Sequence, residues 1–356
     1  MDGTHLNNKI GIVGGGITGL ISAYFLSLEG YKVDLYEKKT LLSETSSKTT
    51  KLIHGGIRYL ENLQFHEVKN GINDRKWWLE NFPDETKLQE IIILSKKKLS
   101  PEIFKFFLGI KVYETFAGRS NIKTGRLYKQ DHLLSLGIKN NISAGISFYD
   151  GLMQESVGQE IIKRCKSHGV NFYENNEIKT IRSEGCIEEK QYKKIIIATG
   201  PWISSFLKQN KIETNKTIDY IKGSHLIINR KIKKGLMFRD QKKHRYIFAL
   251  PYQGNLLLGT TEQRVSSPED NQVLDSEVNY LLESINVYTD RPIKKDEIIE
   301  SYAGVRPLIK SKAQDFHSSS RDFYIQKDHN LLSLFGGKWT TAPSIARNIV
   351  RIVNNE

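Results

Sequence analysis

The feature that most constrains the fold is a glycine-rich turn near the start of the chain, where residues 14–19 carry the spacing G-x-G-x-x-G. An apolar strand, Ile10 to Val13, precedes this turn, and a helix-like stretch, Ile17 to Leu28, follows it. A second strand, Lys32 to Tyr36, then ends beside Glu37. The spacing alone is weak evidence. With a strand before it, a helix after it and an acid at the end of the next strand, it predicts a dinucleotide-binding βαβ unit.

The three glycines of this turn have different steric tasks. Gly14 makes the tight turn, Gly16 lets the backbone approach a pyrophosphate, and Gly19 allows the helix to pack closely on the strand. The helix begins at Ile17 and Thr18, so its free N–H groups and the positive end of its dipole face the phosphates. The sequence therefore predicts an anion-binding turn rather than a glycine-rich loop without a ligand.

The acid after the second strand indicates which dinucleotide is bound. Glu37, next to Lys38, is placed to accept hydrogen bonds from the adenosine ribose hydroxyls, and an acid there disfavours the extra phosphate of NADP. Further on, KKIIIATG at residues 193–200 predicts a buried parallel strand that ends at Gly200, close to Trp202. A strand that returns to the site with glycine where backbone meets ligand is common in two-domain flavoproteins.

A second glycine pair near the end of the chain favours FAD over NAD. Residues 336–337 lie in LLSLFGGKWTT, just before a helical stretch from Ala342 to Val353 that Thr340 or Thr341 is expected to cap. A second helix N-terminus aimed at the ligand suggests a second negative centre. Reduced flavin is such a centre, and Lys338 would add to its stabilisation.

The segment KTTKLIHGGIRYLE, residues 48–61, fits neither a helical nor an alternating apolar pattern. Two glycines break it at residues 55–56, while Lys51, His54 and Arg58 crowd it with basic side chains. Arg58 offers a charged fork for a substrate anion, and the alternative is a structural salt bridge. Nearby hydroxyls and backbone N–H groups are expected to meet a pyrophosphate and a ribityl chain, and they belong to Ser46, Ser47, Thr49 and Thr50.

These motifs together resemble FAD-dependent glycerol-3-phosphate dehydrogenase, a family within the glycine-oxidase and D-amino-acid-oxidase-like flavoproteins. The resemblance covers nearly the whole chain and rests on GGGITG, KTTKLIHGGIRYLE, ATGPW, KGSH, GTTE, SYAGVRPL, RDF and FGGKWTT. It implies an α/β chain (α+β overall) with a Rossmann-like FAD-binding domain and an interleaved antiparallel-sheet substrate domain. It also implies that residues 48–61 pass along the flavin.

The FAD-binding residues expected from these motifs are Gly14, Gly16, Ile17, Thr18, Gly19, Glu37, Lys38, Ser46, Ser47, Thr50, Lys51, His54, Gly200, Trp202, Gly336, Gly337, Lys338, Trp339 and Thr340. Two domains are expected from the same motifs. Residues 1–83, 147–219 and 301–356 would form the FAD-binding domain, and residues 84–146 and 220–300 the substrate domain.

The resemblance implies removal of hydride from a C–OH group of a small anionic substrate to flavin N5, with glycerol 3-phosphate or a related phosphorylated alcohol as the substrate. A phosphate dianion is costly to desolvate without bidentate partners, and Arg58, Arg306 and Arg321 are expected to supply them. Lys338 would serve the flavin and the substrate oxygen together. His225 is the candidate base for the hydroxyl proton. Considered one at a time, the arginines also fit the role of surface charges, and His225 fits that of a core histidine.

The sequence departs from the family pattern at the substrate end. Trp339 stands where leucine is usual, Ala342-Pro343 where an arginine is usual, and Glu262 where aspartate is usual. The family usually continues with a helical C-terminal domain, so we expect a shortened form. A 2-hydroxy acid, an amine or an amino acid therefore stays open as the substrate. A non-enzymatic FAD-fold module that binds RNA or protein stays open as well.

The composition limits which partners and which cellular location we expect. The net charge of +13, from 53 basic and 40 acidic residues, is spread in short clusters without an RNA-binding signature, so we expect no nucleic-acid partner. The two cysteines, Cys165 and Cys186, lack metal-ligand spacing, and no metal is expected. No apolar run reaches the ~18 residues that span a bilayer. These features favour a cytoplasmic protein.

One segment leaves membrane contact open. Residues 100–116, SPEIFKFFLGIKVYETF, are rich in aromatic and apolar side chains and follow three lysines at residues 96–98. The segment suits an anchor at the inner face of a membrane, where quinone would accept the electrons, and it equally suits a core helix. The electron acceptor is accordingly quinone or oxygen.

Overall fold

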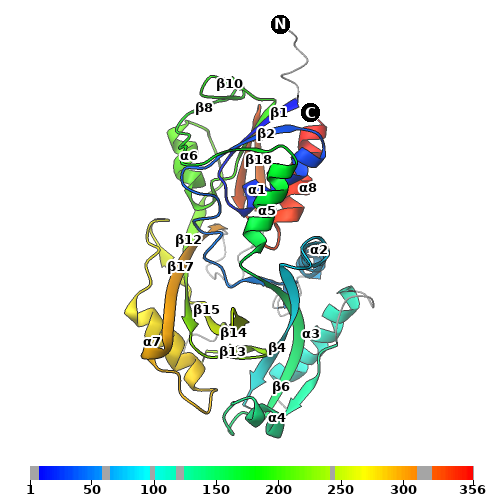
Figure 1. Cartoon of the computed structure of the whole chain (residues 1–356), viewed down its shortest axis with the longest axis vertical. Helices are drawn as coiled ribbons and strands as arrows, with labels where there is room; N and C mark the ends of the chain where they lie inside the picture. The colour runs from blue at the N-terminus through cyan, green and yellow to red at the C-terminus, as the bar shows by residue number, and fades with distance from the viewer. Residues whose placement is uncertain are drawn as a thin grey trace.

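The computed structural model describes residues 8–57, 65–96, 101–117, 124–240, 245–310 and 323–355. Two predicted site residues, Arg58 and Arg321, lie outside the described residues. Within the described part of the chain, the strands form a six-stranded sheet, a ten-stranded sheet and a small three-stranded sheet. Figure 1 shows the six-stranded sheet in the upper half of the molecule and the large sheet in the lower half, so the chain has a mixed α/β architecture as predicted.

The six-stranded sheet is built around β1, the strand that feeds the glycine-rich turn. β1 pairs in parallel with β2 on one side and with β11 on the other, which places Ile12 between Leu35 and Ile196. Only the edge pair β18–β19 is antiparallel among the described pairings of this sheet. Its strand order is β18 (Phe323–Asp328), β19 (Leu331–Gly336), β11 (Lys194–Ile197), β1 (Lys9–Val13), β2 (Lys32–Tyr36) and β7 (Asn171–Tyr173).

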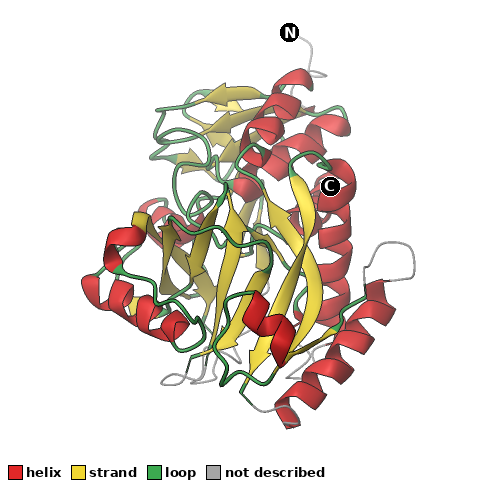
Figure 2. Cartoon of the chain, turned by 60° about the horizontal axis from the view of Figure 1, so that its bottom comes forward, coloured by secondary structure: helices red, strands yellow, loops and turns green. Residues whose placement is uncertain are grey.

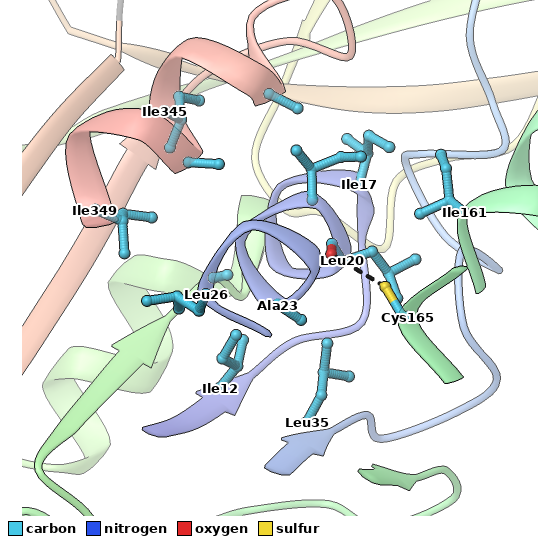
Figure 3. Close-up of a cluster of buried hydrophobic side chains, with 14 of the residues drawn as sticks. Ile12, Ile17, Leu20, Ala23, Leu26, Leu35, Ile161, Cys165, Ile345 and Ile349 are labelled. Carbon is cyan, nitrogen blue, oxygen red and sulfur yellow. Dashed lines mark hydrogen bonds between the residues drawn. The ribbon is translucent and has the colours of Figure 1, made fainter. Parts of the chain in front are cut away.

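Helix α1 (Ile17–Leu28) is the packing centre of this half, and it forms over the residues that the sequence predicts. Figure 3 shows α1 between the strands that carry Ile12 and Leu35 and two further helices, α5 (Val157–Ser167) and α8 (Ala342–Asn354). Ile161 of α5 and Ile349 of α8 approach it from opposite sides, and both are buried. This packing against the sheet and two helices holds the N-terminus of α1 at the end of β1.

The ten-stranded sheet is largely antiparallel, as predicted for the substrate region. Only β4 and β13 pair in parallel among its described pairings. Its main path is β16 (Gln263–Val265), β12 (Ile218–Ile228), β15 (Asn255–Gly259), β14 (Tyr246–Tyr252), β13 (Gly235–Arg239), β4 (Thr86–Ser95), β6 (Ala144–Met153) and β3 (Leu52–Ile53), while β17 (Ile298–Ile309) pairs with β12 and β5 (Leu127–Lys129) with β6. The division into two domains stays a prediction, and its positions 147 and 301 fall inside β6 and β17.

The remaining elements cover these sheets and their edges (Figure 2). They are α2 (Phe65–Asn81), α3 (Pro101–Ala117), α4 (Gln130–Ser135), α6 (Ile203–Gln209), α7 (Asp275–Asn286), the short 3-10 helices η3 (Gly200–Trp202) and η4 (Lys295–Glu297), and the three-stranded sheet of β8 (Ile181–Arg182), β9 (Cys186–Ile187) and β10 (Lys190–Gln191). None of the described helices is long and apolar enough to cross a bilayer.

Helix α3 settles part of the open question about residues 100–116. Phe106 and Tyr113 face the core, and the Phe106 ring packs edge-on against Tyr246 at 5.6 Å. On the other side of the same helix, Phe104, Phe107 and Leu108 are 68%, 47% and 57% exposed. The segment is therefore a core helix on one face and an exposed apolar surface on the other.

Candidate active site

A cavity of about 1010 Å³ is lined by segments of both large sheets, at the upper end of the volumes usual for small-molecule sites. The glycine-rich turn, the loop after β2, the turn after β3, η3 and the loop before α8 all contribute to its wall. These segments are far apart in the sequence. The parallel strands β1, β2, β11 and β19 bring all of them except the turn after β3 to one edge of the six-stranded sheet. This is the position at which open α/β sheets bind ligands.

The geometry of the glycine-rich turn agrees with the task predicted for each glycine. Gly14 has a φ of +111°, and a Cβ there would overlap the carbonyl oxygen of Ala198. A Cβ on Gly19 would overlap the Gly14 oxygen, so α1 could not pack as closely on β1. Gly16 differs, because a Cβ there would meet only the Ser46 hydroxyl, at 3.2 Å. Its missing side chain leaves space in the cavity rather than in the protein interior.

Polar groups of this loop are already oriented around the cavity. The Ser46 hydroxyl accepts a hydrogen bond from the Ile17 N–H at 3.0 Å, which ties the loop after β2 to the start of α1. The Glu37 carboxylate accepts from the N–H groups of Gly15 and Lys39, at 2.7 and 2.8 Å, one on each oxygen. Each oxygen retains a second lone pair, so Glu37 is held in place and can still accept from a ligand hydroxyl.

The glycine pair near the end of the chain also contributes to the wall of the cavity. Gly336 and Gly337 have φ of +71° and +86°, and both line the cavity just before α8. Thr341 occupies the N-cap position of α8, but its hydroxyl accepts from the Lys338 N–H at 2.9 Å instead of capping the helix by a side-chain bond. The start of α8 is thereby held at the cavity with the positive end of its dipole close by.

Two buried polar atoms test whether a ligand fits here. Over the described ranges, Thr199 Oγ1 and Trp339 Nε1 have no hydrogen-bond partner, and both residues line the cavity. Buried polar atoms in proteins are nearly always paired, so an unpaired acceptor or donor in a cavity wall indicates a bound group. Together with the space above Gly16 and the fixed Glu37, they fit the predicted dinucleotide.

The predicted FAD-binding residues divide between the wall of the cavity and positions behind it. In the wall lie Gly14, Gly16, Ile17, Thr18, Glu37, Lys38, Ser46, Thr50, His54, Gly200, Trp202, Gly336, Gly337, Lys338, Trp339 and Thr340. Gly19, Ser47 and Lys51 are not in the wall. The Lys51 ammonium donates to the Ser47 carbonyl at 2.7 Å and lies over the rings of Tyr252 and Tyr302, so this pair supports the loop from behind.

Arg306 and Lys338 are the predicted substrate cations that the described residues bring to the cavity. Arg306 lies on β17, and its Nη2 donates to the Thr260 hydroxyl at 2.9 Å. A Cβ on Gly223 of the neighbouring strand would overlap this guanidinium, so the glycine makes room for it. The Thr260 hydroxyl thus fixes the Arg306 guanidinium in the wall, and Gly223 leaves space for it.

Two arginines that the sequence reading missed also line the cavity. Arg239 ends β13, and Arg245, which is 6% exposed, directly precedes β14. The Arg245 guanidinium lies 3.1 Å from the carboxylate of Glu262, which also lines the cavity. Both arginines flank the polar run RDQKKHR, which suggests a solvated hairpin turn. The one signal in the sequence was that Arg239 ends an apolar strand and Arg245 directly precedes the next one.

His225 lies behind the wall rather than in it. It is 1% exposed on β12, stacks on the Tyr302 ring at 5.0 Å, and shares a 2.9 Å hydrogen bond between its Nε2 and the Thr50 hydroxyl. Thr50 itself lines the cavity. Burial, with further contributions from the charges of Arg306 and Lys51, lowers the pKa of His225 well below its usual range. His225 is therefore neutral near pH 7 and is separated from the cavity by Thr50.

Among the described residues, no group of three or more His, Cys, Asp or Glu side chains is arranged to hold a metal ion.

Comparisons with known proteins identify the family of this chain. A family profile described as FAD dependent oxidoreductase matches residues 9–352. The aerobic glycerol-3-phosphate dehydrogenase of Staphylococcus saprophyticus subsp. saprophyticus is 31% identical over 371 residues, which cover 96% of this chain. The chain spans 66% of the length of that relative.

Two solved structures share the fold. The glycerol-3-phosphate dehydrogenase of Bacillus halodurans complexed with FAD superimposes with a TM-score of 0.75 at 21% identity, over 98% of this chain and 64% of the other. The L-alpha-glycerophosphate oxidase of Mycoplasma pneumoniae with FAD bound gives a TM-score of 0.78 at 20% identity, over 97% and 94% of the two chains. The predicted family resemblance and the predicted cofactor FAD are confirmed by these matches.

The steric role of Gly16 gives a first prediction. Gly16→Val should fold, since its φ of −73° and ψ of 178° suit any residue, yet it should purify without FAD because the side chain fills space in the cavity. Flavin absorbance per mole of protein measures the loss. Gly30→Ala is the control: its φ of +83° costs roughly 1–2 kcal/mol of stability, but FAD should remain. Recovery of Gly16→Val fully loaded with FAD would overturn the site assignment.

The depressed pKa of His225 gives a second prediction, in stability. In the unfolded chain this imidazole binds a proton below about pH 6.5, whereas burial prevents that in the folded protein. The unfolded state then binds more protons, so the free energy of unfolding should fall by up to about 1.4 kcal/mol for each pH unit below 6.5. Denaturant unfolding of the parent and of His225→Gln between pH 7.5 and 5.5 measures the difference. Parallel pH curves for the two proteins would contradict the neutral, buried state.

Proposed function

This chain belongs to the FAD-dependent oxidoreductase family, and from that premise we propose that it oxidises the C–OH group of a small phosphorylated alcohol, with glycerol 3-phosphate as the first candidate. The observation that carries the proposal is that Arg306 and Lys338 line the same cavity as the glycine-rich turn. The curated relative whose name is aerobic glycerol-3-phosphate dehydrogenase supports this substrate class.

The charge of the cavity suits a dianion. Arg306 is held by the Thr260 hydroxyl, and Arg239 and Arg245 add two more cations to the wall. Arginine pairs with phosphate through two parallel N–H···O bonds, which compensate the cost of removing the anion from water. Arg58 and Arg321 remain predicted members of this clamp, outside the described residues.

FAD, when bound, supplies the two-electron acceptor of the oxidation. The residues of the chain must then position the alcohol and take up its hydroxyl proton. We keep His225 as a candidate for that proton, acting through Thr50, because Thr50 lines the cavity and shares a 2.9 Å hydrogen bond with it. The positive charges that lower the pKa of His225 would be partly offset by the bound dianion.

His54 is the second candidate for this base, since its side chain belongs to the cavity wall directly. Comparison of His54→Ala with His225→Ala in anaerobic flavin reduction would separate the two. A larger loss in His54→Ala would favour direct proton transfer, and an equal loss in Thr50→Val and His225→Ala would favour transfer through Thr50.

A 2-hydroxy acid or an amino acid is the alternative substrate. Glu262 in the cavity wall motivates it, because a carboxylate could receive an amine, although Arg245 pairs with that carboxylate at 3.1 Å. Anaerobic mixing of the FAD-loaded protein with phosphorylated alcohols, hydroxy acids and amino acids, followed by flavin bleaching, distinguishes the classes.

The arginine clamp gives the third prediction. Arg306→Lys keeps the charge but loses one arm of a planar, bidentate fork. A charge-assisted hydrogen bond contributes about 1.5–3 kcal/mol, so kcat/KM for glycerol 3-phosphate should fall roughly ten- to a hundredfold at unchanged FAD content.

Arg230→Lys is the matched control, because Arg230 pairs with Glu297 at 2.9 Å and does not line the cavity. Its kcat/KM should equal that of the parent. Equal rates for the parent and Arg306→Lys would show that the clamp is misassigned. If the flavin of the parent protein bleaches only with another class of substrate, that class becomes the proposed one.

We propose further that the electron acceptor is a membrane quinone, reached when the exposed face of α3 lies in the lipid interface, and that oxygen is the alternative. This face carries Phe104, Phe107 and Leu108, three apolar side chains that are 47–68% exposed. Apolar residues on one helix side are typical of interfacial helices.

The fourth prediction tests this face. Phe104→Glu and Leu108→Glu should each weaken binding to anionic liposomes in a sedimentation assay, since both place a charge in the interface. Leu134→Glu on α4, where the side chain is 43% exposed, is the control and should bind like the parent. Phe106 is unsuitable for this test, because it is 7% exposed and packs in the core. Unchanged partitioning of both α3 variants would favour oxygen or a water-soluble acceptor.

A further inference from the structure

The turn after β3 is held by a buried hydrogen-bond network that the oxidation itself does not use. β3 pairs with β6 up to the pair Ile53–Gly151, and the ladder ends there. Beyond it, the Gly55 N–H donates to the Asp150 carboxylate at 2.9 Å. A side chain of β6 thus continues the pairing that the backbone has stopped, and it does so at the wall of the cavity, which Asp150 and Gly56 both line.

Asp150 is fixed from two further elements. The same Oδ1 accepts from Arg75 of α2 at 3.1 Å and from the Tyr113 hydroxyl of α3 at 3.0 Å. Arg75 also donates to the Tyr113 hydroxyl at 2.7 Å and to the Tyr149 carbonyl at 3.0 Å. The side chains of Arg75 and Asp150 are 4% and 2% exposed. A buried carboxylate with three donors on one oxygen cannot rotate without breaking all three bonds.

Tyr113 also determines the residue type in the turn. A Cβ on Gly55 would overlap the Tyr113 hydroxyl oxygen, so only glycine fits beneath it. The Gly55 carbonyl group packs against α2, since a Cβ on Gly71 of that helix would lie 2.9 Å from the Gly55 oxygen and 3.1 Å from its carbon. Both peptide units of the turn are therefore held by contacts with other elements, one by Asp150 of β6 and the other by α2.

This orientation has a consequence for Gly56. The peptide unit between Gly55 and Gly56 is trans, so its N–H points opposite to its C=O. Gly56 is buried, lines the cavity and has a φ of +83°. Within the part of the chain that the structure describes, its N–H donates to no protein acceptor. Buried backbone N–H groups are nearly always paired, so this one is available to a ligand.

We propose that Asp150, locked by Arg75 and Tyr113, is a positioning residue that aims the Gly56 N–H at the FAD in the cavity. This inference rests on the FAD site and is independent of which alcohol is oxidised. Neither Arg75 nor Tyr113 lines the cavity, so neither side chain contacts the cofactor. It acts through the backbone of the turn, and it ties α2, α3 and β6 to that one peptide unit.

The test compares two variants with a matched control in the FAD-loaded protein. Asp150→Asn replaces one carboxylate oxygen by a donor, and Tyr113→Phe removes a single hydroxyl while leaving the Arg75–Asp150 pair. Tyr128→Phe is the control, because Tyr128 is 1% exposed, donates to Glu90 at 2.7 Å and does not line the cavity. The readouts are the melting temperature, the dissociation constant for added FAD and the visible spectrum of the bound flavin.

All three variants should lose thermal stability, since each breaks a buried hydrogen bond. Only Asp150→Asn and Tyr113→Phe should also weaken FAD by roughly three- to tenfold and shift the flavin absorption bands, because a purely structural bond does not change the flavin environment. FAD affinity and spectra like those of the parent in both variants would overturn the proposal. If Asp150→Asn does not fold, Tyr113→Phe alone decides. The substrate plays no part in these readouts, so their outcome is separate from that of the proposed oxidation.

Discussion

The close approach of three backbone segments at one edge of the six-stranded sheet is the constraint on which the rest depends. Gly14 lies against the carbonyl of Ala198, and Gly19 lies against Gly14, with no room for a side chain at either glycine. This contact holds the start of α1 beside the end of β11. Because β19 pairs with β11 in parallel, the loop before α8 reaches the same edge. Two helix N-termini, those of α1 and α8, thereby border one cavity, and their dipoles favour an anionic ligand between them.

The large sheet supplies the arginines of the cavity wall. Their placement is limited by the free-energy cost of burying positive charge. Two of its arginines have a polar neighbour: Arg306 has the Thr260 hydroxyl and Arg245 has the Glu262 carboxylate. His225 remains neutral behind Thr50, because a further positive charge in that interior would be unfavourable. The turn at Gly55 and Gly56 joins the two halves, and its buried anchor, Asp150, belongs to the large sheet.

The sequence predicted the parts of this arrangement that are encoded locally. The limits of α1 and β2 follow from a glycine spacing and apolar runs within 30 residues, and the structure has the same limits. The antiparallel sheet was likewise predicted from alternating stretches such as β14 and β15. Helix α3 was ambiguous because its buried and exposed faces are both apolar, so periodicity could not separate them.

Long-range contacts explain what could not be predicted. Whether His225 touches the cavity depends on Thr50, which is 175 positions away in the chain. Arg239 and Arg245 flank a polar run that reads as a solvated turn, and only the pairing of β13 with β14 brings both into one wall. The role of Asp150 was equally hidden, since nothing next to it in the sequence indicates that its partners come from α2 and α3.

The central claim is that one cavity holds FAD at the glycine-rich turn and the substrate anion at Arg306. A crystal structure of the protein with FAD and glycerol 3-phosphate tests it most directly. The account predicts the FAD pyrophosphate over Gly16 at the start of α1, the flavin ring beside Gly56, and the substrate phosphate in hydrogen-bond contact with the Arg306 guanidinium. A pyrophosphate away from the glycine-rich turn, or a substrate phosphate out of reach of Arg306, would contradict it.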